Sequence, residues 1–324
     1  MNKTILIVLA TILLLFTAAC GKDNNSVQTN KDNSKEKVTV YTTVYPLTYF
    51  TERIGGDHVK VTSIYPAGSN EHTFEPTQKN MMDLADADLF FYIGLGLEGF
   101  VDKAKRTLSG EQVKMVATAD ALTDDEIQAG MVEEEDEHDE EGHEDHHHGA
   151  IDPHVWISPV LSQKLSLSIK NALIEQDPEH EATYTENYEK LIAELNQLDA
   201  DFKEMADQAE NKTFFVSHAA FGYLAKPYGL EQVSIAGLNS QDEPSQKKLT
   251  EIVELAKEKN IKTILFEQNV SSKTANVIRK EIGADSLVMH NLGVLTDNDI
   301  KNNETYFTLM KRNLQTLKTA LNSK

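Results

Sequence analysis

Residues 178–210 read PEHEATYTENYEKLIAELNQLDADFKEMADQAE, and this stretch decides the fold. Its apolar residues recur at helical spacing, at Tyr184, Tyr188, Leu191, Leu195, Leu198, Phe202 and Met205. Pro178 suits the first turn of a helix, where a missing N–H loses no partner. About 30 residues make a helix roughly 45 Å long, which exceeds the width of one small domain. The stretch therefore predicts either a coiled-coil arm or a strut between two lobes.

The residues before this helix, 38–177, alternate short β-rich runs with helical periods. We expect strands at 38–44, 59–65, 89–93 and 113–117, with helices at 46–55, around 81–85, at 97–108 and at 162–175. This rhythm is typical of a mainly parallel sheet flanked by helices. We therefore expect an N-terminal α/β lobe.

The same rhythm resumes after the helix, in residues 211–324, which favours the strut. We expect strands at 213–217, 232–235, 261–267 and 286–290, a helix from Pro244 and Ser245 and a final helix over 304–322. Ser245 is a good candidate to cap its helix. The predicted fold class is α/β, with two lobes joined by one long rigid helix over 178–210. Clefts between such lobes are where ligands usually bind.

The first 37 residues predict export and lipid anchoring. Residues 1–19 carry one lysine and an apolar core that is short for a membrane span, which is typical of a signal peptide. Cys20 is the chain's one cysteine and stands where a bacterial lipoprotein signal places its acylated thiol, although Thr17 occupies a position where leucine is commoner. The alternative is a free structural cysteine. Residues 20–37 are then a lipidated cysteine and a flexible polar tether, which places the protein at the outer face of the bacterial cell membrane.

Residues 133–149 read EEEDEHDEEGHEDHHHG and indicate metal contact. Imidazole suits zinc, copper and nickel, and five of the chain's eleven histidines lie here, at His138, His143, His146, His147 and His148. A segment this charged favours a mobile loop, and the alternative is a solvated acidic linker. Much of the net charge of −21 comes from this tract. The sequence has no basic stripe of the kind that binds nucleic acid, so we expect no nucleic-acid partner.

Four histidines outside the tract follow predicted strands or lie in strand-to-helix turns, which is the edge where α/β sheets bind ligands. They are His72, His154, His218 and His290. Three neutral imidazoles plus a further ligand or water form a common zinc arrangement, whereas manganese favours more carboxylate. We expect the two remaining histidines, His58 and His180, to be solvated. No H-E-x-x-H motif and no P-loop is present in the sequence.

Three histidine motifs carry a resemblance that covers essentially the whole chain after the tether. The segments 70–76 (NEHTFEP), 152–156 (DPHVW) and 217–223 (SHAAFGY) resemble the zinc/manganese solute-binding lipoproteins of ABC importers, as do 243–245 (EPS) and Phe266-Glu267. The resemblance implies metal held between two lobes, by His72 and His154 from the first and His218 from the second. Histidine in the third motif and the His-rich tract are similar to the zinc branch of this family.

The fourth ligand departs from the family pattern. Relatives place an aspartate or glutamate after the last strand, where this chain has Met289-His290-Asn291-Leu292-Gly293. His290, Glu267 or a water are the candidates, because Gly293 has no side chain to offer.

The resemblance implies capture and delivery, not catalysis. We expect a monomer that binds Zn²⁺ and passes it to a membrane permease, with ATP hydrolysed by a separate subunit. A manganese-binding importer component is one alternative. An anchored zinc hydrolase is another, and it requires an open metal position with a carboxylate in reach of the bound water.

Overall fold

The computed structural model describes residues 37–130, 150–241, 244–268 and 272–322. The predicted signal peptide, Cys20 and the His-rich tract lie outside the described residues. Residues 37–324 form one compact unit. Among the described residues, none of the helices combines the length and the apolar character needed to span a membrane.

The N-terminal lobe is built on a four-stranded parallel sheet of order β2-β1-β3-β4. Its strands are β1 (Val38–Thr42), β2 (Val59–Ser63), β3 (Leu89–Tyr92) and β4 (Lys114–Ala117). Its helices are α2 (Tyr45–Gly55), α3 (Gln78–Ala85), α4 (Val101–Thr107), α5 (Asp124–Gln128) and α6 (Pro159–Gln176). All four residues of the inner strand β3 are buried, as a strand covered on both faces requires.

The C-terminal lobe repeats this plan with a parallel sheet of order β6-β5-β7-β8. Its strands are β5 (Thr213–Val216), β6 (Glu231–Ser234), β7 (Thr263–Phe266) and β8 (Asp285–Val288). Its helices are α8 (Gly222–Ala225), α9 (Gln246–Glu258), α10 (Lys273–Ile282), α11 (Asp297–Lys301) and α12 (Tyr306–Leu321). Ser245 caps α9 as expected, since its Oγ accepts from Lys248 N at 3.2 Å.

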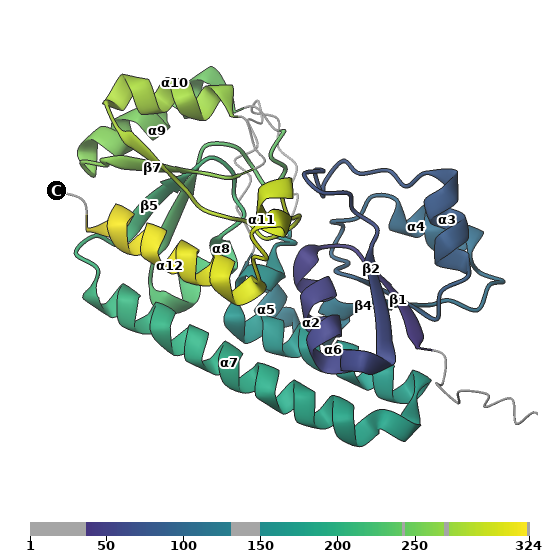
Figure 1. The fold of residues 1–324 in the computed structure, drawn as a ribbon. Helices are drawn as coiled ribbons and strands as arrows, with labels where there is room; N and C mark the ends of the chain where they lie inside the picture. Colours follow the sequence, from purple (N-terminus) through teal and green to yellow (C-terminus); the bar gives the residue numbers. More distant parts are fainter. Residues whose placement is uncertain (1–36, 131–149, 242–243, 269–271, 323–324) are drawn as a thin grey trace, which may run out of the picture. The chain divides into compact units, whose positions relative to one another are not determined.

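The long helix α7 (Glu181–Gln208) has 28 residues and contacts α2 and α6 of the first lobe and α12 of the second. Figure 1 shows it running past both lobes. Six of the seven predicted apolar positions are buried, and Tyr188 is half-buried. The predicted first turn, from Pro178 to His180, is a short 3-10 helix rather than α-helix. The prediction of two α/β lobes with one long helix is confirmed.

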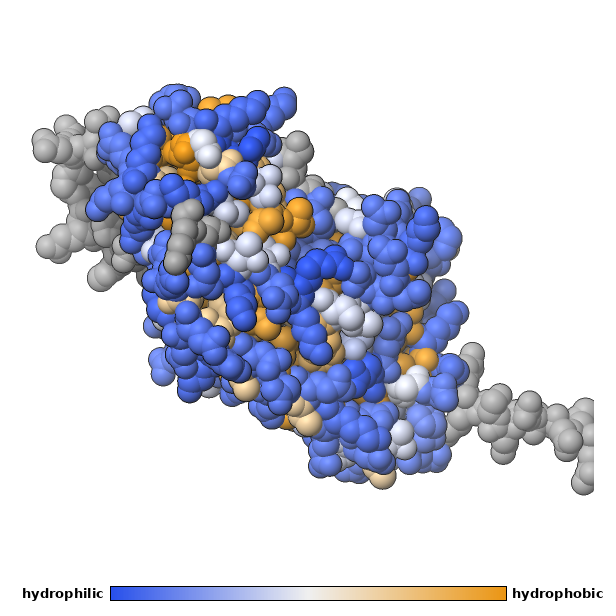
Figure 2. All heavy atoms as spheres, turned by 60° about the vertical axis from the view of Figure 1, so that its left-hand side comes forward, coloured by the Kyte–Doolittle hydropathy of each residue, from blue (hydrophilic) through white to orange (hydrophobic). Residues whose placement is uncertain are grey.

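Two apolar cores stabilise the lobes. The main core joins the first sheet, α2, α6, α7 and α12 to one face of the second sheet. The small core, on the other face of the second sheet, lies under α9 and α10. Successive residues of β5 show this division, because Phe214 and Val216 belong to the main core and Phe215 to the small one. The face in Figure 2 is mainly hydrophilic, with hydrophobic residues in small patches.

An aromatic cluster joins the two lobes within the main core. The Tyr306 ring of α12 lies 4.9 Å from Phe50 and 6.3 Å from Tyr49, both on α2. The Tyr306 hydroxyl is 3.2 Å from Ser162 Oγ on α6, and it also donates to the Trp156 carbonyl oxygen. The lobes are therefore joined by continuous packing as well as by the chain.

The helix predicted over residues 97–108 begins later, at Val101. Gly94, Leu95 and Gly96 have φ values of 87°, 55° and 82°, which no right-handed helix adopts. The turn lets Glu98 accept hydrogen bonds from Ile93 N at 2.8 Å and Gly94 N at 3.0 Å. A buried carboxylate therefore sets the start of this helix, which helical periodicity alone does not reveal.

Candidate metal centre

His72 lies in the loop between β2 and α3, where no regular element holds it. Its backbone N–H donates to Asn70 Oδ1 at 2.9 Å, which closes a tight turn. The Asn70 amide in turn donates to Ser240 Oγ of the second lobe at 3.0 Å. The His72 loop is therefore fixed partly by the opposite lobe.

His154 is fully buried and stands just before the 3-10 turn of Val155–Ile157. Asp152 Oδ1 accepts from both the backbone N–H and ring Nδ1 of His154, at 2.8 and 2.7 Å. A carboxylate that holds Nδ1–H leaves the lone pair of Nε2 for a metal. The short segment after the tract therefore fixes both the place and the tautomer of this imidazole.

His218 follows β5 and is fully buried as well. Its Nδ1 lies 3.0 Å from Glu267 Oε2, a carboxylate that follows the neighbouring strand β7. Its Nε2 lies 2.8 Å from the carbonyl oxygen of Leu238. Two of the three histidines thus share one feature, a carboxylate at Nδ1.

The three imidazoles converge. His72, His154 and His218 each offer a ligand atom, and these atoms lie within 4.8 Å of one another. The Nε2 atoms of His72 and His154 are 3.1 Å apart. Nitrogens bound tetrahedrally to one zinc ion at 2.0–2.1 Å stand about 3.3 Å apart, so this spacing suits a shared ion. Among the described residues, this is the one cluster of at least three potential metal ligands.

The pKa values of His72 and His218 are shifted in opposite directions. Burial and the two neighbouring imidazoles lower the pKa of His72 to about 3, so His72 is neutral at pH 7. Burial also acts to lower the pKa of His218, but the charge and hydrogen bond of Glu267, with the Leu238 carbonyl, raise it to about 9. A metal ion therefore has to displace a proton and the Leu238 carbonyl from His218.

His290, the predicted fourth ligand, does not belong to this cluster. Its Nε2 lies 3.1 Å from Asp299 Oδ2 on α11. Its Nδ1 accepts from the backbone N–H of Leu292 at 2.9 Å. These contacts hold His290 against α11 and the loop after β8, apart from the three clustered imidazoles.

His58 and His180 are not simply solvated, as the sequence had led us to expect. Their rings stack at 3.6 Å between centroids, and both side chains are half-buried. His180 Nδ1 also lies 2.5 Å from Asp177 Oδ2. The pair packs the end of α2 against the start of α7.

Three residues that support the cluster were not assigned a role from the sequence: Glu71, Asp152 and Asn291. Asp152 stands two residues before His154, a spacing typical of a side chain that bonds the backbone ahead of it, and this signal was available. Glu71 is buried and its pKa is raised by that burial. Glu267, a candidate fourth ligand, instead bonds His218 and Asn291.

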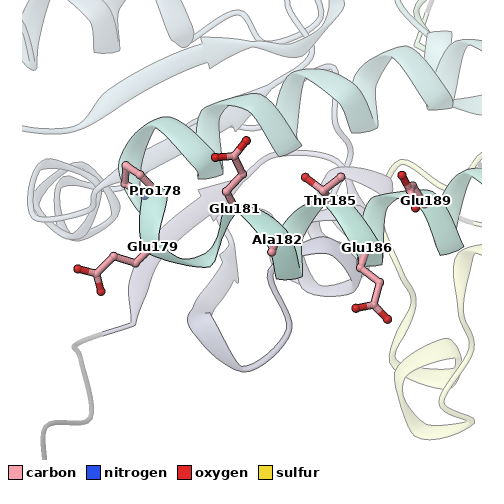
Figure 3. Close-up of a pocket in the computed structure, with 7 residues that line it drawn as sticks. All are labelled: Pro178, Glu179, Glu181, Ala182, Thr185, Glu186 and Glu189. Atoms are coloured by element: carbon pink, nitrogen blue, oxygen red, sulfur yellow. The ribbon is translucent and has the colours of Figure 1, made fainter.

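The surface pocket in Figure 3 is a separate feature, on the first turns of α7. Glu179, Glu181, Glu186 and Glu189 line it, and all four are exposed. None of the three clustered histidines lines it. An exposed acidic group of this kind is ordinary helix surface.

Comparison with known proteins places the chain. The family model described as zinc-uptake complex component A, periplasmic, matches residues 40–320. The chain belongs to this family. It is 39% identical over 316 residues to the high-affinity zinc uptake system protein ZnuA of Bacillus subtilis, covering 98% of this chain and 97% of that protein.

One further relative is longer. The chain is 38% identical over 317 residues to the zinc-binding lipoprotein AdcA of Streptococcus pneumoniae, which covers 98% of this chain but 60% of AdcA. The structure of Zn(II)-bound AdcA matches with a TM-score of 0.72 at 34% identity, over 89% of this chain and 59% of that one. The metal-dependent lipoprotein YcdH of B. subtilis matches with a TM-score of 0.71 at 37% identity, over 88% of this chain and 99% of that one. The chain thus spans about three fifths of AdcA.

Proposed function

We propose that this protein captures Zn²⁺ outside the cell and delivers it to an ABC permease for import. The observation that carries the proposal is the convergence of His72, His154 and His218, whose ligand atoms lie within 4.8 Å of one another. His72 and His154 come from the first lobe and His218 from the second, so one ion would bridge both. Family membership supports the same conclusion, because its named members include zinc uptake and zinc-binding proteins.

The donor set supports zinc over manganese. Three imidazole nitrogens form a ligand set that zinc favours, whereas manganese favours carboxylate and other oxygen ligands. Asp152 Oδ1 holds His154 and Glu267 holds His218, so these carboxylates support the imidazoles. Because His290 lies outside the cluster, we assign the fourth position to a water molecule.

The same contacts support binding rather than catalysis. A zinc hydrolase needs a carboxylate that is free to take a proton from the metal-bound water. Here Glu71 and Glu267 both accept from the Asn291 amide, at 2.9 and 2.8 Å. Glu71 and Glu267 therefore help to hold the ligand-bearing segments in place.

The cellular setting of the proposal rests on the sequence. Cys20 would carry the lipid that holds the protein at the outer face of the cell membrane, with residues 20–37 as the tether. A relative named as a lipoprotein supports this assignment. A monomer would then dock on the permease, and the ATPase subunit would supply the energy for transport.

The proposal is tested on the full chain, stripped of metal and titrated with zinc against a chelator of known affinity. One tight site per chain is expected, and the triple variant His72→Ala, His154→Ala, His218→Ala should lose it. The His-rich tract stays intact in that variant and controls for weak binding elsewhere. A tight site that survives the triple substitution would contradict the proposed ligands.

The two alternatives are tested on the same preparation. Manganese at a large excess should fail to displace zinc at equilibrium, and displacement would identify a manganese importer component instead. Zinc-loaded protein should not turn over ester or peptide substrates. Turnover that disappears in the triple variant would identify a hydrolase.

A further inference from the structure

Asn291, in the loop after β8, uses the whole hydrogen-bonding capacity of its side chain while 4% exposed. Its Nδ2 donates to Glu71 Oε1 at 2.9 Å and to Glu267 Oε2 at 2.8 Å. Its Oδ1 accepts from Gly293 N at 3.0 Å and from Gln268 Nε2 at 3.2 Å. A primary amide has two donor hydrogens and two acceptor lone pairs, so all four are satisfied. The backbone N–H of Gly293 can only donate, which fixes the orientation of the amide.

The partners of Asn291 adjoin all three proposed ligands. Glu71 is the residue next to His72, and Glu267 holds Nδ1 of His218. The backbone carbonyl oxygen of Asn291 accepts from Trp156 Nε1 at 2.7 Å, and the centroids of the Trp156 and His154 rings are 5.2 Å apart. Asn291, a residue of the second lobe, is therefore connected to the segments that carry His72, His154 and His218.

A neutral amide is well suited to this place. Glu71 and Glu267 are two buried carboxylates from opposite lobes, and each is 6% exposed or less. Buried carboxylates that approach one another need hydrogen-bond donors. The Asn291 NH₂ group supplies a donor to each of them and adds no charge.

The chain next to Asn291 is shaped around the same contact. A Cβ atom at Gly293 would lie 2.5 Å from Glu71 Oε1, closer than real contacts allow. The absence of a side chain at residue 293 thus leaves room for Glu71 to reach Asn291. The role of this glycine is to admit a carboxylate from the opposite lobe.

We infer that Asn291 is a positioning residue, which locks the ligand-bearing segments of both lobes in the arrangement that holds zinc. The inference rests on the proposed function and deepens it. Partners that orient metal ligands typically contribute 10–100-fold to metal affinity. A residue connected to all three ligands should contribute within or above this range.

The test compares Asn291→Leu with Asn313→Leu in the full chain. Asn313 is a matched control because it is buried and its side-chain amide bonds the backbone N–H and the backbone carbonyl of His290, at 2.8 and 2.7 Å. Zinc affinity is measured by chelator competition, ligand geometry by the d–d spectrum of bound Co²⁺, and folding by urea titration. We expect Asn291→Leu to lower zinc affinity 10–100-fold and to change the Co²⁺ spectrum. Asn313→Leu should lower the urea midpoint and leave affinity within about twofold.

A second variant guards against a failure of Asn291→Leu to fold. Gly293→Ala pushes Glu71 away from Asn291 without changing the amide, and a roughly tenfold loss of zinc affinity is expected. Wild-type affinity and an unchanged Co²⁺ spectrum in the folded variants would overturn the inference. Equal affinity losses in Asn291→Leu and Asn313→Leu would overturn it too, because the effect would be general. The proposed function fails separately, if the triple histidine variant keeps the tight site.

Discussion

The main core and the small core lie on opposite faces of the second sheet. Residues that follow the proposed ligands His154 and His218 in the chain belong to the main core. Val155 and Trp156, which follow His154, belong to it, and so do Ala220 and Phe221, which follow His218. The small core consists mainly of residues of α9 and α10 that pack on one face of β5 and β7. We conclude that the site depends on the packing that joins the lobes, and that the outer layer of the second lobe is independent of it.

The largest effect is expected from Tyr306→Ala, in the aromatic cluster that joins the lobes. The substitution removes a ring with no exposed surface, and large-to-small changes of this kind lower the free energy of unfolding by about 3–5 kcal/mol. Urea titration of the metal-free chain measures the loss. Val277→Ala, at a side chain 65% exposed on α10, is the control and should change stability by under about 0.5 kcal/mol. Similar losses for the two variants would remove the distinction between core and surface.

Ile278→Ala tests the small core. This side chain of α10 is 2% exposed and belongs to the small core, so a loss of about 2 kcal/mol is expected. Because proteins open in local units, hydrogen exchange should rise in α9 and α10 before it rises in α7. Zinc affinity should stay within about twofold of the unsubstituted chain, and a tenfold fall would show that the two cores are coupled.

Asp152→Ala tests the site itself, with little change in the packing around it. The substitution removes the carboxylate that holds Nδ1 and the backbone N–H of His154. Zinc affinity should fall about 10–100-fold, or roughly 1.4–2.7 kcal/mol. Asp88→Ala is matched in kind, since Asp88 Oδ2 accepts from the backbone N–H and hydroxyl of Thr39 in the same lobe. It should lower stability and leave affinity unchanged, and a shared loss of affinity would contradict the role of Asp152.

The fold was largely predictable because the periods of helix and strand are visible in the sequence. The seven apolar positions of residues 184–205 need no tertiary information, and neither does the placement of His72, His154 and His218 at strand ends or in turns. What the sequence could not show was which strand-end histidine is used elsewhere. His218 and His290 both follow strands of one sheet and both meet a carboxylate. They differ in place, because His218 lies in the cluster and His290 lies outside it against Asp299 of α11, and no local pattern reveals this.

The supporting residues were hidden for the same reason. Asn291 and Glu71 are 220 positions apart and meet only when the lobes pack. Glu98 is another case, because its hydrogen bonds to the backbone of Ile93 and Gly94 accompany the late start of α4 at Val101. Polar residues at such contacts follow no period, so the sequence locates the ligands more readily than the groups that hold them.

The His290–Asp299 pair predicts a small, pH-dependent effect. The hydrogen bond to His290 and, secondarily, the contacts with Thr296 lower the pKa of Asp299. A carboxyl whose pKa is lower in the folded state than in the unfolded chain adds stability above the unfolded value, about 3.9, and loses it as pH falls through the folded value. Asp299→Asn should therefore lower the unfolding free energy by about 1 kcal/mol at pH 6. The difference should shrink below about pH 4 in urea titrations.

Asp297→Asn, at an exposed position of the same helix, controls for the loss of one charge. The two variants should differ at pH 6 and converge in acid. A difference that grows toward pH 3 would show the opposite sign and exclude a stabilising ionised Asp299. Zinc affinity at pH 7 should be the same in both variants, because His290 lies outside the cluster.

The smallest effect on affinity is expected from deletion of residues 133–149. Gly130, shortly before the tract, lies against the Tyr223 ring, because a Cβ there would meet the ring at 2.0 Å. The Tyr223 hydroxyl donates to the Ile127 carbonyl at 2.8 Å, and His154 follows soon after the tract. Both flanks of the tract are thus anchored near the cluster through contacts of their own. The deletion should leave one tight zinc site per chain and affinity within about twofold, as measured by chelator competition.

Its effect should appear in the rate of capture. Many weak imidazole and carboxylate ligands would hold zinc ions close to the cluster, so their loss should slow zinc uptake by cells when zinc is scarce and not when it is abundant. Replacement of the five histidines by asparagine at unchanged length is the matched control for loop length. If the deletion abolishes the tight site while that replacement preserves it, loop length holds the cluster together. If both abolish it, the primary ligands lie in the tract and His72, His154 and His218 do not suffice.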